Sequence, residues 1–497
     1  MTRRISVCFL PLLLVSTIGV APAGAHGLHE GDRLDIPESA PDAGDVRWLA
    51  GDHHIHSRYS TSYDTDKDPP EPKVGGDAIY PIPMNALMAR KFGLSWMVAT
   101  DHGGPNHSKV NHDRAYPELL LSRELVPDVV QFFGMELNSP AADHSSIIIP
   151  AGSDEADRLQ ELELAFDARE AWPEDPARNT EPKMLEALRA AQKQSKKPVV
   201  IAHHPSRSAT GMGEYGMTTP RELRSWNDTA PDIAVGMEGA PGHQASGEGG
   251  QASEAYARYF GTSQIMRGAY TKFPTMGGFD QMTARLGGFW DSMLGEGRRW
   301  WITANSDSHI HWSEGGMDYW PGEYSKTYVH ARKAPQEILE AIRAGKAFVT
   351  TGDLVSGVEI LNGKTPVELG GTIEAKRGET LHLTIRFRDP DGNNAKGQNP
   401  TVRRVDLIRG TVTGKAGNPD QDRNPTARIE SRFTADDWRK DGEWVTIETE
   451  LPPIEGNAYI RLRGTNTSEA EPAPDTPGED VWSDLWFYTN PVFIVTR

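Results

Sequence analysis

The sequence comprises 497 residues with a formal net charge of −18, a length at which chains usually divide into more than one domain. Hydrophobic residues make up 37% of the chain and charged residues 25%, which excludes a disordered or collagen-like polymer. The acidic balance excludes a nucleic-acid scaffold protein, because such proteins bind by broad neutralisation of phosphates.

The first 25 residues resemble an export signal. Two arginines precede an apolar stretch at 5–20, and small residues offer a cleavage site after Ala25. We therefore expect a periplasmic or secreted protein. No membrane span is expected, because no later segment has the roughly 20 apolar residues that a span needs. The single cysteine, Cys8, lies inside this signal, so a metal site in the mature chain has to use His, Asp and Glu.

The rest of the chain divides into three predicted parts. Residues 26–45 are polar and rich in Gly, Pro and Asp, as in a linker. From 46 to 351 short apolar runs alternate with helical patterns, which is typical of β/α units forming a parallel sheet or barrel. From 352 to 497 alternating segments are separated by Pro- and Gly-containing turns, which predicts a smaller all-β, sandwich-like domain.

The first folded part is predicted to contain seven strands and a long insertion. The strands are predicted at 46–53, 95–100, 129–136, 145–149, 198–202, 233–237 and 300–304. The insertion at 239–297 carries several aromatic residues, and loops of this length in a compact domain often form lids or substrate walls. We therefore expect the insertion to contact organic substituents of a substrate.

Histidines and carboxylates recur just after these predicted strands. Because side chains two apart in an extended segment point the same way, His54 and His56 can reach one ion. Asp307 and His309 repeat this spacing after the last strand, and Glu136 ends an apolar strand where its charge is costly to bury without a cation. The other motifs are Thr100-Asp101-His102, His144 and His203-His204-Pro205. Barrel enzymes assemble their sites from several strand ends, so a metal-dependent active site is predicted.

Taken in order, these motifs resemble the polymerase-and-histidinol-phosphatase (PHP) family of metal-dependent phosphoesterases. The order is H-x-H, T-D-H, G-x-E, a following His, A-H-H-P and S-D-x-H, over roughly residues 46–350. The resemblance implies an α/β fold, a distorted (β/α)7 barrel with two or three Zn, Mn or Fe ions at its C-terminal rim. The later segments are similar to an exported branch with a C-terminal β domain, which also resembles hydrolases of the aryl carbamate carbaryl.

The resemblance also implies which residues hold each metal ion. The residues that match the ligands of the first ion are His54, His56, Glu136 and Asp307. Glu136 would bridge to a second ion held by His144 and by His203 or His204, and the neighbouring proline favours His204.

A third ion is implied at His102 and His309. The family has one more His or Asp a few residues after H-x-H, and Asp64 lies one position out of that spacing. Asp64 is thus the expected third ligand.

The expected activity is hydrolysis of P–O bonds in small-molecule phosphate esters by a hydroxide that bridges the ions. Phosphodiesters, including small organophosphate diesters, are favoured over monoesters. One alternative is a carbamate or carboxylic ester hydrolase that uses the same metal site, and another is a phosphomonoesterase. A third is a non-catalytic periplasmic metal or ligand binder. No obligatory protein partner is evident.

Several residues are candidates for roles other than metal binding. Arg207 is expected to clamp a phosphoryl oxygen, with Arg58 as a second candidate. Asp101 is placed to orient an imidazole. The proton for the leaving group has four candidate donors, Asp101, His203, His243 and His311.

Overall fold

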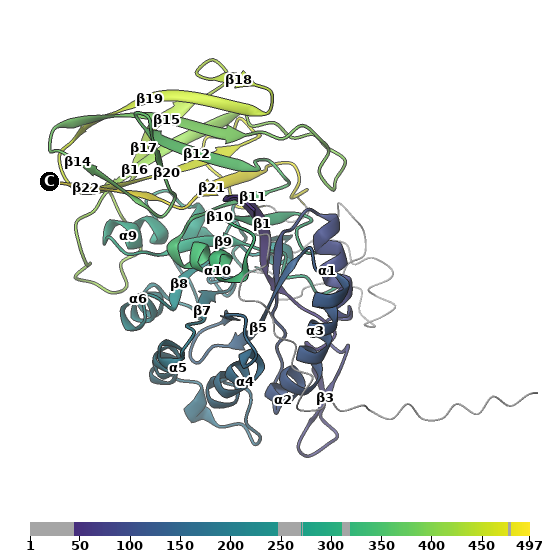
Figure 1. Ribbon diagram of the computed structural model, residues 1–497. Coiled ribbons are helices and arrows are strands. Elements are labelled where there is room, and N and C mark those ends of the chain that lie inside the picture. Colours follow the sequence, from purple (N-terminus) through teal and green to yellow (C-terminus); the bar gives the residue numbers. More distant parts are fainter. Residues whose placement is uncertain (1–43, 247–269, 271, 311–318, 476–478) are drawn as a thin grey trace, which may run out of the picture. The chain divides into compact units, whose positions relative to one another are not determined.

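The computed structural model describes residues 44–246, 270, 272–310, 319–475 and 479–497 (Figure 1). The expected signal peptide and nearly all of the expected linker lie outside the described residues. Parts of the expected insertion, including Tyr256, Tyr259 and Phe260, also lie outside them. Within the described ranges, no helix is both long enough and apolar enough to cross a membrane.

Each of the seven strands predicted up to residue 304 has a counterpart in the structure. They are β1 (Arg47–Ile55), β4 (Trp96–Ala99), β5 (Val130–Asn138), β6 (His144–Ile149), β7 (Val199–Ala202), β8 (Ala234–Ala240) and β9 (Trp301–Ala304). They pair in this order and run parallel, except that β6 is antiparallel to both neighbours. The last strand returns to the first, because Ile55 and Ser308 form a parallel bridge. The ends of β1 and β9 therefore meet.

Helices connect these strands. Their bounds are α1 (Ile82–Lys91), α2 (His107–Val110), η1 (Asn111–Ala115), α3 (Tyr116–Leu125), α4 (Glu155–Phe166), η2 (Pro176–Arg178), α5 (Glu181–Lys193), α6 (Pro220–Thr229), η3 (Gly242–Ser246), α8 (Gln281–Ala284), α9 (Phe289–Gly295) and α10 (Pro335–Ala344). Local sequence sets their ends. A capping box of Thr219 and Glu222 begins α6, and Gly345 ends α10 with a φ of 68° that favours glycine.

Further strands extend the sheet beyond β1. They are β10 (Ser325–Ala331), β11 (Ala347–Thr351), β14 (Thr372–Ala375), β16 (Arg404–Thr411), β17 (Arg428–Phe433), β20 (Ala458–Thr465), β21 (Trp486–Thr489) and β22 (Val492–Thr496). Within the described residues they complete a mixed sheet of 15 strands, in which β11 pairs with β21. A short hairpin, β2 (Ser62–Asp64) and β3 (Glu71–Lys73), stands apart from this sheet.

A second, antiparallel sheet belongs to the C-terminal part of the chain. Its strands are β12 (Gly357–Asn362), β13 (Thr365–Val367), β15 (Glu379–Arg388), β18 (Arg439–Asp441) and β19 (Trp444–Ile454). Alternate side chains of β15 are buried, as expected for a strand with one face on a core. Phe387 of β15 shares one apolar core with Phe487 of β21. The fold is thus mixed α/β with a separate antiparallel region.

Two of the aromatic residues predicted in the insertion, Phe279 and Trp290, belong to the core. Phe279 and Trp290 are fully buried in the core that also contains Trp96 of β4 and Phe132 of β5. The Trp290 indole donates to Trp300 O at 3.0 Å. The expectation that these two side chains line a substrate wall is wrong, because both are packed inside.

Candidate metal centre

Histidines and carboxylates gather where the strands β1, β4, β5, β7 and β9 end. A pocket of about 200 Å³ opens among them. Its lining residues are Asp77, His102, Glu136, His144, His204, Arg207, His243, Gln244, Asp307 and His309. We call this set, together with His54, His56 and His203, the histidine cluster. The described residues contain several His/Asp/Glu groups whose ligand atoms lie close enough to hold a metal ion.

The H-x-H pair of β1 converges on two carboxylates. The Nε2 atoms of His54 and His56 lie 2.9 Å apart, and each lies 3.1 Å from Asp307 Oδ1. Glu136 Oε1 lies 3.2 Å from His54 Nε2, and Glu136 Oε2 lies 3.5 Å from His56 Nε2. These side chains are nearly inaccessible to solvent. The structure therefore brings all four expected ligands of the first ion together.

Hydrogen-bond acceptors fix the Nδ1 atoms of His54 and His56. His54 Nδ1 donates to Glu238 Oε1 at 2.7 Å. His56 Nδ1 contacts Ser60 Oγ at 2.8 Å, and that hydroxyl donates to Asp101 Oδ1 at 2.8 Å, so it accepts from the imidazole. Each Nδ1 thus carries a proton, and in the neutral imidazole Nε2 presents a lone pair to the centre. Asp101 orients His56 through Ser60 and stays outside the pocket.

Glu136 Oε1 is shared by a second group of imidazoles. His203 Nδ1 lies 2.8 Å away, His144 Nδ1 2.9 Å and His204 Nε2 3.2 Å. The rings of His203 and His54 stack with centroids 3.6 Å apart, and His203 Nε2 also contacts Ser146 Oγ. Both of the adjacent histidines therefore reach the bridging carboxylate, and only His204 of the two lines the described pocket.

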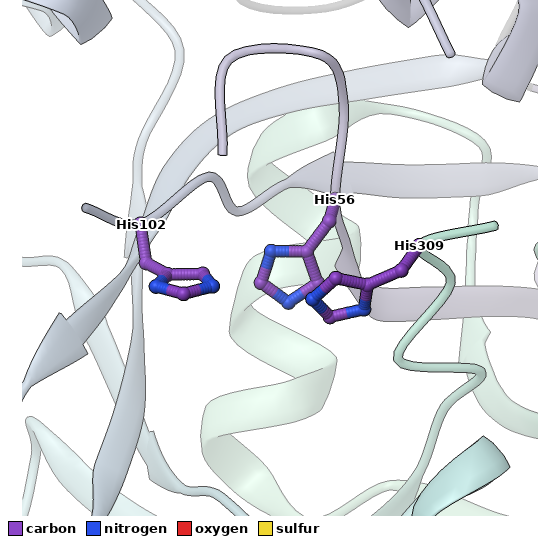
Figure 2. A group of neighbouring side chains, drawn as sticks. All are labelled: His56, His102 and His309. Atoms are coloured by element: carbon purple, nitrogen blue, oxygen red, sulfur yellow. The ribbon is translucent and has the colours of Figure 1, made fainter. Parts of the chain in front are cut away.

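A third group combines His102 of the loop after β4 with His56 and His309 (Figure 2). The carboxylate beside them is Asp77, whose Oδ2 lies 3.0 Å from His102 Nε2 and 3.3 Å from His309 Nε2. The structure does not bring Asp64 here. Asp64 lies in the hairpin strand β2, where its Oδ1 is 4.0 Å from Lys73 Nζ. After the H-x-H pair, Ser60 still contacts His56, and Asp77 is the carboxylate that reaches His102 and His309.

The pKa values in the histidine cluster reflect the presence of many imidazoles around few carboxylates. Burial alone would raise the pKa of Glu136, but His144 and His54 hold it well below its usual range. The pKa of Asp307 is likewise lowered against burial, by His54 and His243. Burial and His309 lower the pKa of His56. The centre therefore favours ionised carboxylates facing at least some neutral imidazoles.

Two residues of the cluster adopt left-handed backbone conformations that non-glycine residues rarely use. His204 has a φ of 25° and Asp307 a φ of 50°. Such conformations cost of order 1–3 kcal/mol each and persist where surrounding contacts enforce them. His204 N donates to Glu238 Oε2 at 2.5 Å, and Asp307 O accepts from His309 Nδ1 at 2.9 Å. The strain is thus held by the same side chains that build the centre.

The other candidate residues differ in their access to the pocket. Arg207 lines it, and its guanidinium donates to both carboxylate oxygens of Asp143. Arg58 is engaged by Glu118 and Tyr59 outside the pocket. His243 lines the pocket, with Nδ1 donating to Asp307 O at 2.5 Å. His311 lies outside the described residues.

Sequence reasoning missed two carboxylates that the structure places in or beside the cluster. Glu238 is fully buried at the end of β8, and its motif Gly236-Met237-Glu238 repeats Gly134-Met135-Glu136. That repeat is a signal that could have found it. Asp77 follows the hairpin of β2 and β3, and no spacing pattern in the sequence marks it.

No family model and no curated protein matches this sequence. Among solved structures, a chitin-binding domain from Burkholderia pseudomallei is 14% identical over 25% of this chain and 57% of its own, with a TM-score of 0.15. A β-glucosidase from Listeria innocua is 12% identical over 28% of this chain and 16% of its own, with a TM-score of 0.15. An LPMO catalytic domain from Listeria monocytogenes is 13% identical over 26% of this chain and 60% of its own, with a TM-score of 0.13. The matched part thus spans less than two thirds of each of these chains, and similarities this weak carry no argument.

Proposed function

We propose that this chain is a metal-dependent phosphoesterase of the PHP type that cleaves phosphate esters, with phosphodiesters favoured, in the periplasm or outside the cell. The observation that carries the proposal is the convergence of His54 Nε2 and His56 Nε2 on Glu136 and Asp307, within 3.5 Å. Imidazoles whose Nδ1 protons are directed away from the centre, together with carboxylates that face their Nε2 atoms, form a ligand set for divalent cations.

The strand arrangement supports the same family. Seven strands pair in sequence, β6 is inverted, and Ser308 after β9 bridges back to Ile55 of β1. A distorted (β/α)7 barrel has these features. Its strand ends carry the cluster, as in barrel enzymes generally.

The residues fit two or three divalent ions, for which Zn, Mn and Fe are the candidates because imidazoles and carboxylates accept each of them. The first ion would take His54, His56, Glu136 and Asp307. The second would share Glu136 and take His144 with His204 or His203. The third would take His102, His309 and Asp77, which supplies the carboxylate expected from Asp64.

When bound, such cations acidify water and neutralise the oxygens of a phosphoryl group. The chain's own residues complete the site. Arg207 can donate to a phosphoryl oxygen, and Asp143 fixes the plane of its guanidinium. His243 is the candidate for passing a proton to the leaving group, because it lines the pocket and its contact with Asp307 O orients the ring. Asp101 and His203 fit this role less well, since neither lines the described pocket.

A panel of three substrates tests the proposal against its alternatives. Purified, metal-loaded protein is assayed on bis-p-nitrophenyl phosphate, p-nitrophenyl phosphate and an aryl carbamate, beside Glu136→Gln and the control Asp64→Asn. We expect the diester to be cleaved fastest, Asp64→Asn to retain this activity and Glu136→Gln to lose it. Cleavage of the carbamate alone would establish the carbamate hydrolase instead. Bound metal with no turnover would favour the binding protein.

A further inference from the structure

A second pocket, of about 380 Å³, adjoins the histidine cluster. His102 lines both pockets, so a group bound in either one lies beside that imidazole. Its other lining residues are Thr61, Tyr63, Thr65, Pro70, Gly103, Gly104, Pro105, Arg169, Ala171, Trp172 and Glu174. Two aromatic and two proline side chains give it apolar walls. The opposite charges of Arg169 and Glu174 offset each other.

The wall formed by Tyr63 is built against the loop after β4. Gly104 N donates to the Tyr63 hydroxyl at 2.7 Å. A Cβ at Gly104 would lie 3.3 Å from Tyr63 Cε2, and one at Gly103 would lie 2.8 Å from the Tyr63 hydroxyl. The two glycines thus permit the close approach of this ring to the loop that carries His102.

The second aromatic residue that lines this pocket is Trp172, which is 48% exposed although it is large and apolar. Its indole donates to Asp68 Oδ1 at 2.7 Å. Asp167 anchors the segment before it, because Asp167 Oδ1 accepts from Arg169 N at 2.8 Å and from Asn138 Nδ2 at 3.1 Å. Hydrogen bonds therefore hold the indole and its segment in place, so that the ring lines the pocket in a defined position.

We infer that this second pocket binds an aromatic substituent of the phosphoryl compound whose phosphoryl group lies at the histidine cluster. The inference rests on the proposed function. A cavity of about 150 Å³ is enough for benzene, so this pocket admits a phenyl ring beside His102. An aromatic ring packed on Trp172 and Tyr63 gains about 0.5–1.5 kcal/mol beyond area burial, which corresponds to about a twofold to tenfold tighter Kd.

Two phosphonates test this inference without any turnover. Phenylphosphonate and methylphosphonate carry the same phosphoryl group on an unhydrolysable P–C bond and differ in the ring. Titration calorimetry on the metal-loaded full chain gives the ratio of their Kd values. We expect phenylphosphonate to bind about tenfold tighter. Trp172→Ala should bring the ratio close to one, and Trp172→Phe should restore most of it.

The control variant is Leu125→Ala, another exposed apolar side chain, 59% exposed at the end of α3 and away from both pockets. It should leave the ratio at the wild-type value. Equal affinities for the two phosphonates, or a ratio that Trp172→Ala leaves unchanged, would overturn the inference while the proposed function stands. Failure of both phosphonates to bind would overturn the proposed function and this inference together.

Discussion

Two buried clusters of charged side chains in this chain differ in the groups that compensate their carboxylates. In the first, Arg461 Nε and Nη2 donate to the two oxygens of Asp291 at 2.9 and 2.8 Å, and both residues are fully buried. Tyr459 also donates to Asp291 Oδ1 at 2.9 Å. Here a bidentate ion pair and a hydroxyl compensate the carboxylate inside the protein.

In the histidine cluster, imidazoles rather than a bidentate arginine contact the two central carboxylates, and they hold the pKa values of Glu136 and Asp307 well below their usual range. Its two central Nε2 atoms lie 2.9 Å apart and share two carboxylates, while the protons on the far nitrogens are directed outward to Glu238 and Ser60. Burial of charge alone therefore does not identify a metal site. The direction of the lone pairs does, because a set converging on one point calls for a cation.

The largest expected effect comes from Glu136→Gln, which removes the carboxylate that the first and second groups of ligands share. The expected loss of phosphodiesterase activity is on the order of 1000-fold, because cations contribute several kcal/mol of transition-state stabilisation. Metal content should fall in parallel. Assay and metal analysis of one preparation check this, with Asp64→Asn as the matched control. Full metal content and full activity in Glu136→Gln would refute the bridging role.

Asp291→Asn tests the self-compensated cluster. It leaves Arg461 buried without its ionised partner, so the free energy of unfolding should fall by about 3–5 kcal/mol. Denaturant unfolding measures this, and metal bound per folded chain should not change. The control is Asp420→Asn, whose exposed ion pair with Arg221 should matter little. A loss of bound metal in folded Asp291→Asn would contradict the distinction between the clusters.

Glu238→Gln is expected to have a smaller effect, which is a weaker affinity for metal. Glu238 accepts from His54 Nδ1 and His204 N, so it orients a ligand without facing the pocket. Changes to such orienting partners typically weaken metal binding about 10- to 100-fold. Competition with a chromogenic chelator measures the affinity. An unchanged affinity would show that the direction of the His54 lone pair is not set by this carboxylate.

The smallest expected effect concerns pH and lies outside both clusters. Burial and the nearby Glu163 raise the pKa of Glu170 to about 7. The folded state then holds a proton that the unfolded state releases above pH 4.5, so this contribution to stability is present at low pH and is lost as the pH rises towards 7. Thermal melts should decline less between pH 5 and 7.5 in Glu170→Gln than in the wild type. Identical slopes would contradict this.

Much of the fold followed from local patterns in the sequence. Apolar runs predicted the seven strands to within a few residues. The motif residues at β1, β5 and β9 come together because the strand ends of one sheet meet at one edge. Periodicity and spacing were sufficient where a ligand sits on or next to a strand.

The remaining residues were missed for two reasons: most depend on how loops close, which local patterns do not encode, and one lies beyond the predicted end of a strand. Asp64 is near the H-x-H pair in sequence, but the hairpin of β2 and β3 keeps it away and returns Asp77 instead. Glu238 was missed because the predicted strand stopped one residue before it, although β8 continues to Ala240. The apolar walls at Tyr63 and Trp172 come from segments over 100 residues apart, so only tertiary structure joins them.

A direct test of the metal centre is the metal content of the purified protein, measured by plasma mass spectrometry after incubation with Zn²⁺ and Mn²⁺ and removal of free ions. Glu136→Gln and Asp64→Asn are measured in parallel. We predict two or three divalent ions per chain in the wild type and in Asp64→Asn, and fewer in Glu136→Gln. Less than one ion per wild-type chain, or equal content in all three proteins, would contradict it.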